Sequence, residues 1–207
     1  MKFLPVLVAV FCLLACNNKP EPTGQERPKL LHPDSAANFT PINNPYLAID
    51  ISPLDISYCP SDYTKMSLRR TLPVARVIYS RPHKQGRKIF GNLLKFGEPW
   101  RLGANEATEI ELFRNITIQG KQVEKGRYVL YCIPELEKWT VVFNSNLYTW
   151  GLSIDPSKDV YRFEVPTSIK SPPVEYFSLV FETATYGADM TMAWDDVEVV
   201  LPIQYTE

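Results

Sequence analysis

The chain has 207 residues, is 45% hydrophobic and 12% aromatic, and carries 22 Lys and Arg against 23 Asp and Glu, a net charge of −1 at pH 7. Such a composition supports a folded core and argues against an intrinsically disordered protein. The nearly balanced charge, with no basic stripe along the chain, argues against nucleic acid as a partner.

The N-terminus has the pattern of an export signal. Lys2 supplies a positive charge, and an apolar run from Phe3 to Leu14 follows it. This run is too short for a membrane-spanning helix, which needs about 20 apolar residues. Leu13-Leu14-Ala15-Cys16 then resembles the lipobox of bacterial lipoproteins, which implies that residues 1–15 are removed and that Cys16 carries lipid. The alternative is an ordinary secretory signal with an incidental cysteine.

Residues 16–45 are rich in Pro, Asn, Ser and charged side chains and have no apolar period, so they are predicted to form a flexible tether. The lipid bilayer is then a partner through the acyl chains on Cys16. Asn17 stands where the resemblance to Gram-negative lipoproteins implies that Asp would retain the protein at the inner membrane. We therefore expect a cell-envelope protein at the outer membrane, on either its periplasmic or its surface face.

Residues 46–207 are predicted to form one domain, because short runs with an apolar period near two follow one another between turn signals. The predicted strands cover residues 74–80, 107–113, 116–118, 127–133, 139–144, 160–165, 176–183, 190–194 and 197–201. This spacing is typical of an all-β antiparallel sandwich, and we expect a jelly-roll-like one. The alternation over 176–183 predicts that Phe177, Leu179 and Phe181 face the core.

One stretch departs from this period. Ile89, Phe90, Leu93 and Leu94 fall at helical spacing within residues 88–96, which predicts one short helix or turn over an end of the sheets.

Two of the four cysteines, Cys59 and Cys132, fall in the predicted domain. In an oxidising compartment they either form a disulfide, or Cys132 is a buried thiol on its strand and Cys59 is separate from it.

Catalytic and metal motifs are largely missing. The two histidines are His32, in the tether, and His83, in a loop. The lipase-type elbow, the zinc-binding helix and the phosphate loop are absent, and the spacing of Cys and His matches no known ligand set. We therefore predict no catalytic residue, no metal site and no cofactor.

The most unusual segment lies between the helical stretch and a core strand. Trp100, Arg101, Asn105 and Glu106 place an indole beside a guanidinium, an amide and a carboxylate, which is how proteins bind sugars or carboxylates. The candidate ligand residues are these four together with Tyr79, Arg81 and Arg87 from the preceding loop. Alternatively, Arg101 and Glu106 form an internal ion pair that holds the loop, and Trp100 fills the core.

Several runs resemble the domain-of-unknown-function family DUF2911, from about Val74 to the C-terminus. The most specific is 100–108, and the others are 79–82, 86–91, 126–128, 133–134, 139–141, 150–151 and 159–160. The resemblance implies an exported bacterial domain, often a lipoprotein of Bacteroidota-type bacteria, and implies no activity. Cys132 stands where the family pattern implies Ala or Thr, which argues against a disulfide common to the family.

The sequence thus favours a lipid-anchored envelope module that binds a small ligand or glycan. The alternatives are an envelope scaffold without a ligand and a hydrolase using Glu106, although a lone carboxylate lacks the usual partner for glycoside chemistry. No feature of the sequence indicates an oligomeric state.

Overall fold

The structure, a computed structural model, describes residues 52–65 and 71–205. The signal peptide, the Cys16 lipidation site and the tether predicted above lie outside these residues. In the described part of the chain, no helix has the length and apolar character needed to cross a membrane.

The described residues form an antiparallel β-structure, as predicted. Its strands are β1 (Leu54–Cys59), β2 (Ala75–Ser80), β3 (Thr108–Leu112), β4 (Ile116–Ile118), β5 (Lys121–Val123), β6 (Gly126–Pro134), β7 (Lys138–Asn144), β8 (Asp159–Ala184) and β9 (Gly187–Gln204). Two single 3₁₀ turns, Tyr63–Lys65 and Pro156–Lys158, are the helical elements in these residues. The strand order is β1-β2-β3-β6-β7-β8-β9-β4-β5.

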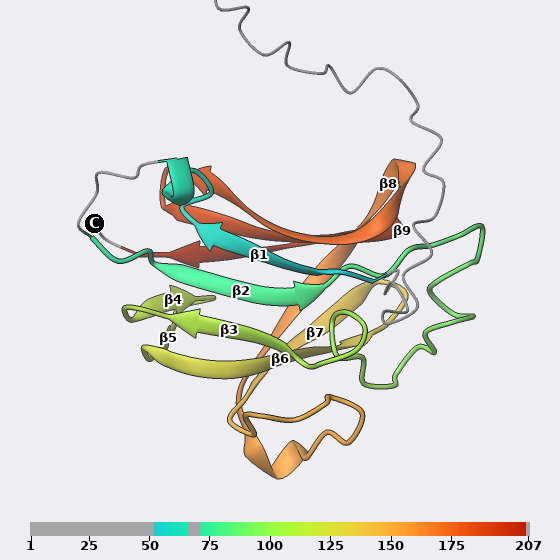
Figure 1. Cartoon of the computed structure of the whole chain (residues 1–207), viewed down its shortest axis with the longest axis horizontal. Helices are drawn as coiled ribbons and strands as arrows, with labels where there is room; N and C mark the ends of the chain where they lie inside the picture. Colours follow the sequence, from blue (N-terminus) through green and yellow to red (C-terminus); the bar gives the residue numbers. More distant parts are fainter. Residues whose placement is uncertain (1–51, 66–70, 206–207) are drawn as a thin grey trace, which may run out of the picture. The chain divides into compact units, whose positions relative to one another are not determined.

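The long strand β8 takes part in both layers of the sandwich. Its first residues, Asp159–Pro166, pair with β7, and the remainder, from Thr167 on, pairs with β9. Figure 1 shows β1, β2, β3 and β6 following one another down one side of the molecule, and β8 bending from its lower end to its upper edge beside β9. Two sheets that share a bent strand enclose the core between them.

Two pairs of segments that were predicted as separate strands each form one continuous strand in the structure. The β8–β9 pairing shifts between Ile169 and Val174, because Pro172 and Pro173 have no N–H to give to the ladder. The chain bends there without ending the strand. Likewise, the predicted strands at 190–194 and 197–201 both belong to β9.

A second register shift in β8, between Val174 and Ser178, attaches the loop after β2 to this strand. The N–H of Phe177 donates to the carbonyl of Pro82 at 3.0 Å, and the N–H of Lys84 donates to that of Glu175 at 2.7 Å. His83 and Tyr176 form an isolated antiparallel bridge, so the segment 82–84 lies against β8.

The predicted core face of β8 is confirmed. Phe177, Leu179 and Phe181 are at most 2% exposed, whereas Tyr176 and Val180 are above 40%.

Of the short helix or turn predicted over 88–96, the turn forms and the helix does not. These residues make turns joined by a bridge between Phe90 and Leu94. Gly91 has φ +82, and a Cβ there would lie 2.8 Å from the Phe96 ring, so a tight turn replaces a helical one.

Candidate functional site

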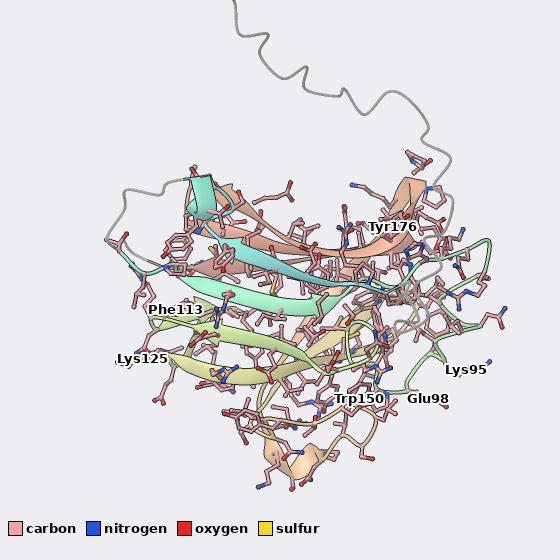
Figure 2. The ribbon with its side chains drawn as sticks, viewed as in Figure 1. Lys95, Glu98, Phe113, Lys125, Trp150 and Tyr176 are labelled. Atoms are coloured by element: carbon pink, nitrogen blue, oxygen red, sulfur yellow. The ribbon has the colours of Figure 1, made fainter. Side chains whose placement is uncertain are left out.

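A cavity of about 420 Å³ opens at the end of the sandwich that carries the loop after β2. We call it the loop cleft. Residues from the segments 82–87, 93–104 and 151–152 line it, together with Ser52 and Trp194. In the view of Figure 2, Lys95, Glu98 and Trp150, which belong to or border these segments, lie toward one end of the molecule, and Phe113 and Lys125 lie at the other.

Two tryptophans form the base of the loop cleft. The rings of Trp100 and Trp194 stack with centroids 5.6 Å apart and are 7% and 2% exposed. The Trp100 ring also meets Phe177 edge-on at 4.9 Å. The backbone of Trp100 exchanges two hydrogen bonds with Cys132 of β6, at 2.7 and 2.8 Å. Trp100 therefore belongs to the core, as one of the two alternatives predicted, and still contributes to the cavity wall.

The loop after Trp100 has a strained backbone. Leu102 has φ +53 although its side chain is fully buried, and a bulky residue rarely adopts this conformation. Its carbonyl accepts a hydrogen bond from Thr108 Oγ1 at 2.6 Å, and the carbonyl of Gly103 accepts one from Trp100 Nε1 at 3.0 Å. A Cβ on Gly103 would lie 2.9 Å from the carbonyl oxygen of Ser80. Side-chain hydrogen bonds and close packing hold the loop in this form.

Arg101 is half-buried in the wall of the loop cleft. Its Nη1 donates to the carbonyl of Trp150 at 3.1 Å, and the side chain packs against Gly151, where an added Cβ would lie 3.0 Å from Arg101 Cβ. Burial lowers the pKa of Arg101, and the charge of Glu106 opposes this shift.

The predicted ion pair between Arg101 and Glu106 does not form. Among the described residues, none of the ion pairs within 4 Å includes either side chain. Asn105 has φ +58, which turns the chain between them, and Glu106 is exposed.

Arg87 lies on another segment of the wall and is exposed. Its Nε donates to the carbonyl of Lys84 at 2.9 Å, and its Nη2 donates to the carbonyl of His83. This segment is fixed to β9 by Asp195, which accepts a hydrogen bond from the N–H of Ile89 at 3.1 Å.

Asn105 and Glu106 line a second cavity, of about 380 Å³, together with Pro53, Leu54 and Trp150. The Trp150 side chain is 55% exposed. The seven predicted ligand residues are thus divided, because Arg87, Trp100 and Arg101 line the loop cleft whereas Asn105 and Glu106 line this second cavity.

Tyr79 and Arg81 line neither cavity. Both side chains contact the carboxylate of Asp55 at 3.3 Å, and Arg81 also donates to the carbonyl of Phe177. Tyr79 is 2% exposed and meets Phe177 edge-on. Burial is the main cause that raises the pKa of Tyr79, so its hydroxyl stays neutral. These two residues connect β2 to β1 and β8.

The residues at the loop cleft that were not predicted include Trp194 and Leu152, which line it, and Asp195, which holds its wall. Trp194 and Asp195 come from β9, and Leu152 comes from the loop after β7. Asp195 and Asp196 interrupt the apolar alternation of their strand, and this interruption was the signal in the sequence that could have identified Asp195.

Cys59 and Cys132 are both buried and both free, so the predicted alternative without a disulfide describes them. Burial raises the pKa of each thiol. Within residues 52–65 and 71–205, no group of three or more His, Cys, Asp and Glu is placed to hold a metal ion.

The sequence pattern of one family matches residues 61–203, so the match begins before Val74, where the resemblance was expected to start. No curated protein and no solved structure matches the chain. The matching family is DUF2911, which is described as a protein of unknown function, and because the match covers more than half of the chain, the protein belongs to that family.

Proposed function

We propose that this protein is a lipid-anchored binding module of the cell envelope that takes a small ligand into the loop cleft. The observation that carries the proposal is the loop cleft itself. A volume of about 420 Å³ is in the range of small-molecule sites, which combine an apolar lining with a few polar groups. Trp100 and Trp194 supply the apolar base, and Arg87 and Arg101 supply polar groups.

The backbone around the cleft supports this assignment. Strained residues such as Leu102 persist only where surrounding contacts hold them, and they are found more often at functional sites than elsewhere.

The proposal of a lipid anchor is based on the sequence alone. Leu13-Leu14-Ala15-Cys16 favours acylation of Cys16, and Asn17 favours the outer membrane. A tether over residues 16–45 would let the domain reach ligands away from the bilayer surface.

Blocking the loop cleft tests the proposal. Ala104 lines the cavity, so Ala104→Trp should fill part of it without removing a charge. A library of small organic anions, neutral compounds, glycans and cell-wall fragments is screened by ligand-observed NMR against the full chain and this variant. Lys125→Trp is the matched control, because Lys125 is exposed at the other end of the molecule.

We expect compounds that bind the wild type and Lys125→Trp equally and lose binding to Ala104→Trp. If no compound of the library binds, or if the compounds that bind have the same affinity for Ala104→Trp as for the wild type, the result would favour the alternative of an envelope scaffold without a ligand. Glycans that depend on Trp150 and Glu106 instead would move the site to the second cavity.

A further inference from the structure

Among the described residues, no carboxylate lies within 4 Å of the two arginines of the loop cleft. Other described arginines pair with a carboxylate within 4 Å, among them Arg76, Arg81, Arg127 and Arg162. Arg87 and Arg101 instead donate to backbone carbonyl oxygens, those of Lys84 and Trp150 among them. These two arginines line the same cavity.

No acidic side chain of the described chain lines that cavity. Glu106 acts on Arg101 from a distance, but it is exposed and lines the second cavity. A half-buried guanidinium without a carboxylate carries a desolvation cost that a bound anion would offset. The planar donors of arginine suit a carboxylate in particular, because they can bind both of its oxygens.

Apart from Ser52 and Gln85, the remaining side chains of the lining are apolar, and two leucines among them are exposed. Leu93 and Leu152 are 46% and 74% exposed and come from different segments of the wall. A compact apolar group held between them would cover surface that now meets water.

The base of the loop cleft argues against a sugar. Sugars stack on exposed aromatic faces, whereas Trp100 and Trp194 are stacked on each other and nearly fully buried. We therefore propose that the ligand is a small amphipathic carboxylate, whose anionic group binds Arg101 and Arg87 and whose apolar body lies between Leu93 and Leu152. This inference rests on the proposed function, since it names the class of ligand for the same cleft.

The test compares cyclohexanecarboxylate with its neutral amide, cyclohexanecarboxamide, which has a similar shape and no charge. Binding to the full chain in detergent is followed by NMR through the indole N–H signals, of which the four tryptophans give one each. Trp100 is the local reporter for the loop cleft.

We expect the carboxylate to shift the Trp100 signal and to bind about 10- to 100-fold more tightly than the amide, as for a charge-assisted hydrogen bond. Arg101→Gln should remove most of this difference, and added salt should reduce it. Arg101→Lys keeps the positive charge but loses the planar pair of donors. Its affinity for the carboxylate should therefore fall between that of the wild type and that of Arg101→Gln.

Arg87→Gln provides a second variant in case Arg101→Gln unfolds, since the Arg87 side chain is exposed. Arg127→Gln is the matched control, because Arg127 pairs with Glu109 outside the cleft, and it should bind as the wild type does.

Two results would overturn the inference in different ways. If the amide or a neutral glycan binds as tightly as the carboxylate and Ala104→Trp blocks that binding, the cleft binds ligands but the class is wrong. If cyclohexanecarboxylate binds and neither Ala104→Trp, Arg87→Gln nor Arg101→Gln weakens it, both the class and the cleft are wrong.

Discussion

Lys84 Nζ lies 2.7 Å from Asp195 Oδ1, and this ion pair joins the segment that carries Arg87 to the inner strand β9. The Asp195 side chain is 7% exposed, and its other oxygen accepts the hydrogen bond from the N–H of Ile89. The carboxylate also raises the pKa of Lys84, mainly through their hydrogen bond. One buried carboxylate thus fixes both Lys84 and Ile89, which flank Arg87 in the sequence.

Asp195→Ala should destabilise the protein by about 2–4 kcal/mol. The change leaves the N–H of Ile89 without its partner, and it places Ala at φ +54, which Asp and Asn tolerate better. Asp195→Asn keeps an acceptor and should cost less. Denaturant unfolding measures both, with the exposed neighbour changed in Asp196→Ala as the control. Equal midpoints for Asp195→Ala and Asp196→Ala would show that this carboxylate does not hold the segment.

Stability should fall as the pH rises from 10 to 12, in part because of Tyr131. Burial, and then the hydrogen bond from its hydroxyl to the carboxylate of Asp159, raise the pKa of Tyr131 to about 12. An unfolded tyrosine has a pKa of about 10. Below pH 10 the Tyr131 hydroxyl is neutral in both the folded and the unfolded state, and its full contribution to the free energy of unfolding is present. Above pH 10 this tyrosine ionises first in the unfolded state, which stabilises the unfolded state relative to the folded one.

Tyr131→Phe should flatten this decline in urea midpoints measured between pH 9 and pH 12. Tyr128, whose pKa burial also raises to about 12, should account for a remaining slope. Tyr148→Phe is the control, because Tyr148 is 84% exposed. The interpretation fails if Tyr131→Phe and Tyr148→Phe change the pH profile equally.

Cys16→Ser should move the protein from the detergent phase to the aqueous phase. The change removes the thiol that the lipobox pattern at Leu13-Leu14-Ala15 presents for acylation. Phase partition with labelled palmitate incorporation measures it, and Cys12→Ser is the control, because Cys12 lies within the predicted signal. If Cys16→Ser partitions as the wild type does, the N-terminus is an ordinary secretory signal and Cys16 is not lipidated.

Most strands could be predicted, because their alternation matches burial on the core face. β1 was not predicted, and its alternation would have given the wrong core face. Leu54 and Ile56 are exposed, while Asp55 is partly buried against Tyr79 and Arg81. β5 has only three residues, too few for a period to be recognised.

The candidate site was only partly predictable. The run from Trp100 to Glu106 identified the right loop, but spacing along the sequence could not show that Asn105 reverses the backbone and separates Glu106 from Arg101. Trp194 comes from a strand far along the chain, and a contact of this kind is set by the fold and not by any local pattern.

The hydrogen bonds from Phe177 and Lys84 attach residues 82–84 to β8, and this has a thermodynamic consequence. The conformational entropy of that wall is lost when the chain folds and not when a ligand arrives. A preorganised wall leaves more of the contact free energy for affinity, so even a ligand of few atoms can be held in a cavity of this size.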